Sequence, residues 1–193
     1  MRKYKLLVIC GKAGSGKNYL FSKLKKHYYN KLNYIVPCTT RPIRENEIEG
    51  EDYHFLTKDE FLKQKDSFIE TTSFNNWWYG TPISSLELNK FNLGIFNPFS
   101  IEQLFARDDL DIHLFYIYAD DKMRVIRQLT REEEPDVNEI CRRFIEDEKD
   151  FQYLLSTFPF RQISNSSSFL EGSPQNLLYR YIDRLLLDSD KIN

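Results

Sequence analysis

The chain has 193 residues, of which 41% are hydrophobic, and this size suits one domain with a packed core. Its formal net charge is −2, so it lacks the strongly basic composition typical of nucleic-acid-binding proteins. The first apolar run, residues 6–10, is too short for a signal peptide or a membrane span. We therefore expect a cytoplasmic protein with no membrane or nucleic-acid partner.

The first half of the chain alternates short apolar runs with one amphipathic stretch. In chain order we expect a strand at 4–10, a helix at 17–31, a strand at 34–38 and a polar loop at 39–52. A small separate sheet is expected from strands at 53–56, 68–74 and 77–80, with a short helix at 59–65. Another helix is expected to start at Pro82 with Thr81 as its N-cap.

The second half continues the alternation. We expect strands at 93–97, 113–119 and 160–163, helices at 101–107, 121–131, 136–155 and 173–187, and a serine-rich loop at 165–168. Asp120 and Asp121 are expected to cap the helix that follows them. Strands that alternate with helices predict an α/β fold, a parallel sheet with helices on both faces.

Three cysteines are scattered along the chain, at Cys10, Cys38 and Cys141. They form no C-x-x-C pair and no metal-ligand spacing. We interpret all three as structural, buried thiols of a protein in a reducing compartment.

The segment between the first strand and the first helix is rich in glycine. It reads Gly11-Lys12-Ala13-Gly14-Ser15-Gly16-Lys17-Asn18. A strand, such a loop and a helix form the context of the P-loop, whose backbone N–H groups bind nucleotide phosphates at a helix N-terminus. We expect these eight residues to bind ATP, with Lys17 bridging the β- and γ-phosphates.

Asn18 departs from the P-loop pattern, in which Ser or Thr places a hydroxyl on Mg²⁺. An amide oxygen is also a ligand for a hard cation, so we expect Mg²⁺ as a cofactor and Asn18 as its ligand. The alternatives are a metal that sits differently and a catalytically weak site.

A second motif follows the P-loop. Its residues are Cys38-Thr39-Thr40-Arg41-Pro42-Ile43-Arg44, Glu45, Glu47, Gly50 and Asp52-Tyr53-His54-Phe55, then Phe68-Ile69-Glu70 and Trp78-Tyr79-Gly80-Thr81. This set resembles the guanylate kinase family, whose pattern reads T-T-R-P-x-R, E, G, D-Y-x-F, F-I-E and Y-Y-G-[ST]. The strong part of the resemblance covers residues 5–81.

The resemblance implies a binding site for an acceptor nucleoside monophosphate (NMP). Arg41 and Arg44 can both fork onto one phosphate, and Tyr53 and Tyr79 can donate hydroxyl hydrogens to it. The alternatives are surface charge for the arginines and core packing for the tyrosines.

The base would be read by Glu70, whose carboxylate accepts the two adjacent donors of guanine, with a further bond from Thr81. A solvated strand residue is the alternative for Glu70. Three positions depart from the family: Pro37 replaces a serine that contacts the base, while Ile95 and Asn97 replace two acids. Asn97 can still bind a base through its amide, which favours a relaxed specificity.

Several arginines flank an acidic segment at 132–136, namely Arg124, Arg127, Arg131, Arg142 and Arg143. The resemblance implies that Arg127, Arg131 and Arg143 belong to a lid that closes over the phosphates and acts in catalysis. The alternative is surface pairing with nearby acids: Glu139, Glu146 and Glu148.

We thus expect one guanylate-kinase-like domain. Its core would comprise residues 1–36, 82–123 and 155–193, with an NMP-binding insert at 37–81 and a lid at 124–154. The expected reaction of purine nucleotide metabolism is transfer of the ATP γ-phosphoryl group to GMP or dGMP, by a monomer or homodimer. The alternatives are a deoxynucleotide or relaxed-specificity kinase and a non-catalytic nucleotide- or protein-binding module.

Overall fold

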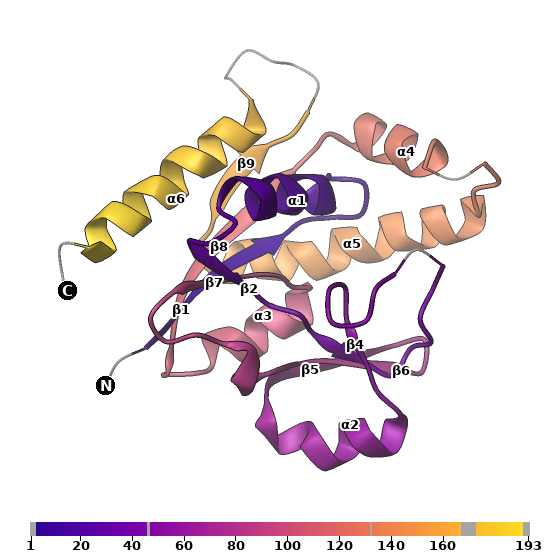
Figure 1. Ribbon diagram of the computed structural model, residues 1–193. Helices are drawn as coiled ribbons and strands as arrows, with labels where there is room; N and C mark the ends of the chain where they lie inside the picture. Colours follow the sequence, from indigo (N-terminus) through magenta and orange to yellow (C-terminus); the bar gives the residue numbers. More distant parts are fainter. Residues whose placement is uncertain (1–2, 46, 132, 167–172, 191–193) are drawn as a thin grey trace. The chain divides into compact units, whose positions relative to one another are not determined.

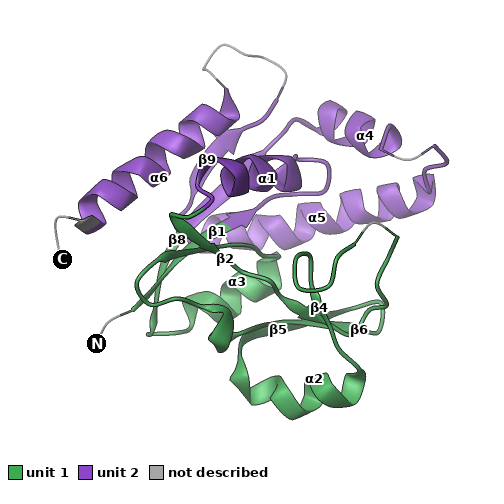
Figure 2. Cartoon of the chain, in the orientation of Figure 1, with its two compact units in different colours: residues 1–8, 30–113 green, residues 9–29, 114–193 purple. Residues whose placement is uncertain are grey.

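The computed structural model describes residues 3–45, 47–131, 133–166 and 173–190 (Figure 1). The chain divides into two compact units (Figure 2). Unit 1 comprises Met1–Val8 and Asn30–His113, and unit 2 comprises Ile9–Tyr29 and Leu114–Asn193. Two of the three boundaries fall inside strands, β1 (Tyr4–Cys10) and β8 (Leu110–Tyr118), and the third lies between Tyr29 and Asn30.

The larger sheet has five strands in the order β2-β7-β1-β8-β9. In unit 1, β2 (Leu32–Tyr34) runs parallel to β7 (Phe91–Ile95). In unit 2, β8 runs parallel to β9 (Arg161–Ser164). Strand β1 is buried from Leu6 to its end, as expected for an inner strand of a parallel sheet. The predicted α/β fold with a helix-flanked parallel sheet is confirmed.

Unit 1 contains a second sheet with the order β4-β3-β6-β5. Its strands are β3 (Cys38–Thr39), β4 (His54–Phe55), β5 (Phe68–Phe74) and β6 (Trp77–Pro82). Strands β5 and β6 pair antiparallel, and β3 pairs antiparallel with β6 and parallel with β4.

Helix α2 (Lys58–Gln64) starts at a capping box formed by Thr57 and Glu60. It packs on the second sheet through Phe61, whose ring lies 4.7 Å from that of Phe68. Two short 3₁₀ turns follow α2 and β6, at Lys65–Ser67 and Ile83–Ser85. Helix α3 (Pro98–Phe105) starts with Asn97 as its N-cap.

Unit 2 contains the remaining helices: α1 (Lys17–His27), α4 (Asp121–Leu129), α5 (Val137–Thr157) and α6 (Pro174–Asp190). Asp120 caps α4 by accepting a hydrogen bond from Met123 N, which confirms its predicted role. Among the described residues, no helix is both long and apolar enough to cross a membrane.

Some expectations were wrong in detail. The helix expected at Pro82 is absent from the described residues 82–86, because Thr81 pairs with Glu70 in the β5–β6 ladder and extends the strand through Pro82. Helix α1 ends at His27, before the predicted position 31. Cys10 and Cys38 are buried, but Cys141 is exposed on α5. The expected acidic segment and serine-rich loop lie partly outside the described residues.

Candidate functional site

The glycine-rich loop of unit 2 connects β1 to α1, as its sequence predicts. Gly14 and Gly16 have φ angles of 76° and 91°, which side-chain-bearing residues rarely adopt. A Cβ on Gly14 would also collide with the backbone of Arg124. The loop therefore needs glycine at these positions to take its shape at the start of the helix.

The ammonium group of Lys17 lies inside this loop. Its Nζ donates to the carbonyl oxygens of Gly11 at 2.5 Å and Lys12 at 3.1 Å. Burial lowers the pKa of Lys17 to about 8, although the nearby Asp147 carboxylate and Cys10 oppose this shift. Lys17 thus lies where a loop-bound phosphate would meet a positive charge.

Two further residues attach the loop to the rest of unit 2. Arg127 NH1 lies 3.3 Å from the carbonyl oxygen of Gly14, and its NH2 donates to the carbonyl oxygen of Asn165 at 2.8 Å. Asn165 Nδ2 donates to the carbonyl oxygen of Ser15 at 2.8 Å. Ser15 itself is buried, and its Oγ has no hydrogen-bond partner in the described part of the chain.

An acidic side chain also reaches the loop. Asp147 of α5 accepts a hydrogen bond from the backbone N–H of Ala13 at 2.6 Å. One amide of the phosphate loop is therefore bonded to a carboxylate, and no sequence motif predicted this contact.

Arg124 of α4 is buried next to this contact, with only 1% of its surface exposed. It donates to the carbonyl oxygen of Ala13 at 3.1 Å and to Asp147 at 3.2 Å. It also pairs with Asp121 and Glu148. The sequence showed Arg124 only as one of the arginines that flank the acidic segment, whereas in the structure it is a buried side chain that supports the loop.

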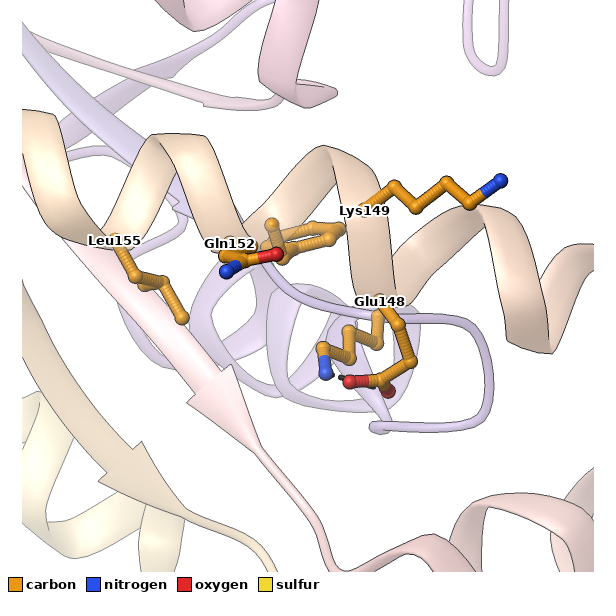
Figure 3. Close-up of a pocket in the computed structure, with 6 residues that line it drawn as sticks. Glu148, Lys149, Gln152 and Leu155 are labelled. Carbon is orange, nitrogen blue, oxygen red and sulfur yellow. Dashed lines mark ion pairs between the residues drawn. The ribbon is translucent and has the colours of Figure 1, made fainter.

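A hollow of about 340 Å³ lies beside the loop on α5 (Figure 3). Lys12 forms an ion pair of 2.5 Å with Glu148 at this hollow, and Lys149, Gln152 and Leu155 also line it. Lys12 is the only one of the eight loop residues that lines the hollow. The hollow therefore lies next to the phosphate loop and is not formed by it.

Asn18 is exposed at the start of α1, next to Lys17. Within the described residues, no group of three or more His, Cys, Asp or Glu side chains could hold a metal. An exposed amide oxygen is a type of ligand that Mg²⁺ accepts, so the Asn18 side chain would fit as one ligand beside the phosphates of a bound nucleotide.

The second group of predicted site residues lies in unit 1. Arg41 is 7% exposed, and its guanidinium forks onto Glu47 with bonds of 3.0 and 2.7 Å. The hydrogen bond from Arg41 holds the pKa of Glu47 below its ordinary value. Glu47 also accepts the backbone N–H of Arg44 at 2.8 Å. The sequence motif included Glu47 but did not indicate that it bonds the Arg41 guanidinium and the Arg44 backbone.

Two tyrosines complete this cluster. The Arg41 guanidinium lies 5.4 Å from the ring centre of Tyr53, whose ring in turn lies 6.1 Å from that of Tyr79. Burial raises the pKa of Tyr53, which favours its neutral, hydrogen-donating form. The side chain of Arg44 is exposed. The structure therefore brings Arg41, Tyr53 and Tyr79 together around the loop that carries Arg44.

Glu70 forms the buried part of the unit 1 site. It is 5% exposed and accepts a hydrogen bond of 2.6 Å from Ser100 Oγ. Thr81 donates to it from its side chain and its backbone. Burial raises the pKa of Glu70, although these hydrogen bonds favour the charged form. The solvated-strand alternative for Glu70 is wrong, because β6 and α3 cover it.

The three positions that depart from the family have separate environments. Asn97 Oδ1 accepts a hydrogen bond from Ser100 N at 2.9 Å and thereby caps α3, while its Nδ2 lies 3.3 Å from Thr72 Oγ1. Ile95 ends β7. The carbonyl oxygen of Pro37 accepts the backbone N–H of His54 at 2.9 Å.

The predicted lid arginines have different surroundings. Arg127 contacts the phosphate loop, as described above. Arg143 donates to Glu139 at 2.6 Å, which is the surface pairing that the sequence offers as the alternative to a lid role. Hydrogen bonds from Arg142 and Arg143 lower the pKa of Glu139 to about 2. Arg131 lies at an exposed position after α4.

The fold and the loop together define an α/β protein of the P-loop nucleotide-binding class. The family model described as guanylate kinase matches residues 3–163. The chain belongs to the guanylate kinase family.

Individual relatives agree with this assignment. A guanylate kinase of Mycoplasma genitalium is 32% identical over 157 residues, which are 78% of this chain and 65% of that protein. One of Lawsonia intracellularis is 39% identical over 82 residues, 42% of this chain and 38% of that protein. The matches to these curated relatives thus span less than two thirds of the relatives' own length.

A solved structure shows the same fold. The guanylate kinase of Anaplasma phagocytophilum matches with a TM-score of 0.64, covering 98% of this chain and 88% of that one. Its sequence identity is 18%, so this likeness supports the fold.

Proposed function

We propose that this chain is an ATP-dependent nucleoside monophosphate kinase that phosphorylates GMP or dGMP. The observation that carries the proposal is the buried Glu70 carboxylate, which is held in unit 1 beside the β6 strand. In its ionised form, a carboxylate is an acceptor-only group and suits a base edge with two adjacent donors, as in guanine. Guanylate kinase relatives support the same acceptor.

ATP is the proposed donor, bound by the backbone of residues 11–18 and by Lys17. Mg²⁺ would accompany it, held by the phosphates and the Asn18 amide oxygen, and would neutralise phosphate charge. The positive charge of Lys17 compensates the charge of the transferred group.

The acceptor phosphate is assigned to Arg41, Arg44, Tyr53 and Tyr79. Arg41 is now bonded to Glu47, so a phosphate would share or replace that carboxylate as partner. Direct transfer requires the acceptor oxygen to lie in line with the γ-phosphorus, and no covalent enzyme intermediate is needed. We include Arg127, Arg131 and Arg143 as lid residues, within residues 124–154 of a single kinase domain.

The test is a coupled assay of ADP release with ATP, Mg²⁺ and each of GMP, dGMP, AMP, CMP, UMP and dTMP. We expect turnover with GMP and dGMP, and loss of at least about 100-fold in Lys17→Ala, because the charge at the transferred group is lost. Turnover with other bases would show a relaxed-specificity kinase. Binding of GMP without turnover would contradict catalysis and indicate a binding module.

A further inference from the structure

Ser100 supplies one of the hydrogen bonds that surround Glu70. Both side chains are buried, with 3% and 5% of their surface exposed, and the Oγ–Oε2 distance is 2.6 Å. A bond this short to an ionised acceptor belongs to the strong, charge-assisted class. It fixes the plane of the carboxylate as well as favouring its charged form.

The charge state of Glu70 decides which base edge it matches. As a carboxylate it offers acceptors, whereas a protonated carboxyl offers one O–H donor. Burial favours the protonated form, and the donors from Ser100 and Thr81 oppose burial. The side chain at position 100 therefore influences the chemical pattern that a bound base would meet.

Hydrogen bonds on either side of Ser100 in helix α3 fix its position. At its start, Asn97 Oδ1 accepts the backbone N–H of Ser100. One turn further, the Gln103 amide bonds to both backbone groups of Thr71 in β5, at 3.0 and 2.9 Å. Thr71 adjoins Glu70 in the same strand, so these bonds fix Ser100 relative to the carboxylate.

We propose that Ser100 is a specificity-determining positioning residue: it holds the Glu70 carboxylate as a paired acceptor for the two adjacent donors of a 2-amino-6-oxopurine. Asn97 acts through Ser100, as the cap of α3, and does not contact the base. This inference rests on the proposed function, because it takes Glu70 as the group that reads the acceptor base.

The experiment measures GMP, AMP and ATP dissociation constants for the wild type, Ser100→Ala and the near-isosteric Ser100→Cys. Removing a hydrogen bond to a charged group is expected to weaken GMP binding about tenfold in Ser100→Ala. AMP and ATP binding should stay unchanged, and kcat at saturating GMP should change less than KM. Ser100→Cys, a weaker donor, should also weaken GMP binding. Ser156→Ala, an exposed helical serine that bonds to Tyr153 O, is the matched control.

A double-mutant comparison tests the role of Asn97. Asn97→Ala should weaken GMP binding less than Ser100→Ala, and the double variant should bind GMP as Ser100→Ala does, because the cap acts only through Ser100. Additive losses in the double variant would show that Asn97 acts separately.

The outcomes separate the two proposals. If both Ser100 variants fold and bind GMP as tightly as the wild type does, the role of Ser100 is overturned and the proposed function stays intact. If Ser100→Ala does not fold, Ser100→Cys and Asn97→Ala decide in the same way. Failure of the wild type to bind GMP at all would overturn the proposed function, and this inference with it.

Discussion

Lys17 is the residue whose charge the donor site most depends on. Its ammonium group lies among the carbonyl oxygens of its own loop, and burial lowers its pKa to about 8. At pH 7 Lys17 is charged in most of the molecules, but the charged fraction falls as the pH rises through the pKa of about 8. Nucleotide phosphates require the charged form.

We therefore expect ATP binding to weaken in the wild type as the pH rises from about 7 to about 9, since Lys17 must then take up a proton on binding. Lys17→Met should bind ATP weakly and without this pH dependence. Titration calorimetry of both proteins across the range checks the prediction. Parallel pH curves for the two would show that another group is responsible.

Asp147 acts on the same loop with the opposite charge. Its carboxylate bonds to the Ala13 amide and lies near enough to Lys17 to affect its pKa. At pH 7, Asp147→Asn is expected to tighten ATP binding several-fold, by about 1 kcal/mol, because a negative charge near the phosphates is removed while an acceptor for Ala13 N–H remains.

Glu146→Gln on the same helix is the matched control, because it removes one negative charge from α5 at a side chain that pairs with Arg142, at 2.5 Å. Weaker ATP binding in Asp147→Asn would contradict the prediction. It would indicate instead that the carboxylate assists the nucleotide or its cation.

At the scale of elements, unit 2 contains a contact between α1 and α6 that the sequence pattern did not indicate. Tyr28, just after α1, is 1% exposed, and its hydroxyl lies 2.8 Å from Asp183 Oδ1 and 3.1 Å from the carbonyl oxygen of Tyr179. His27 stacks on the Tyr179 ring at 4.0 Å. These bonds connect the helix that starts at the phosphate loop to the C-terminal helix.

Tyr28→Phe is expected to lower the free energy of unfolding by about 1 kcal/mol, because a partly buried hydrogen bond to the Asp183 carboxylate is lost while the ring remains. Tyr29→Phe is the control, since Tyr29 is 77% exposed. Urea denaturation of the three proteins gives the comparison. Equal midpoints would show that the Tyr28 hydroxyl contributes nothing to stability.

At the scale of the whole molecule, the candidate residues divide between the two units. The phosphate loop, Arg124, Arg127 and Asp147 belong to unit 2, while Arg41, Tyr53, Glu70 and Thr81 belong to unit 1. Each unit thus holds its own set of candidate nucleotide-binding groups, and each set has its own internal hydrogen bonds.

Hydrogen exchange should therefore respond separately to the two nucleotides. A non-hydrolysable ATP analogue is expected to slow exchange at residues 11–18, and GMP to slow it at residues 68–82, because bound ligands stabilise the backbone that holds them. Lys17→Met should lose the first effect and keep the second. Protection of residues 11–18 by GMP alone would contradict the assignment of the two sites.

Local sequence patterns predicted most of the elements. Strands β1 and β5 have the predicted bounds. For β1 the reason is local, because a short continuous apolar run is decided by neighbouring residues. The start of α4 was also correct, since Asp120 caps it locally. Errors arose where a partner elsewhere in the chain decides the secondary structure. Thr81, for example, stays in a strand because Glu70 pairs with it.

The sequence by itself determined the fold class and the phosphate loop, because these depend on residue types at short spacing, and its resemblance to the guanylate kinase family made Arg41 and Glu70 candidates. Only the tertiary structure decided that Asp147 reaches Ala13, 134 positions away, and that Ser100 reaches Glu70. Hydrogen bonds and charge states depend on burial and on donors brought by other elements, and no local pattern contains that information.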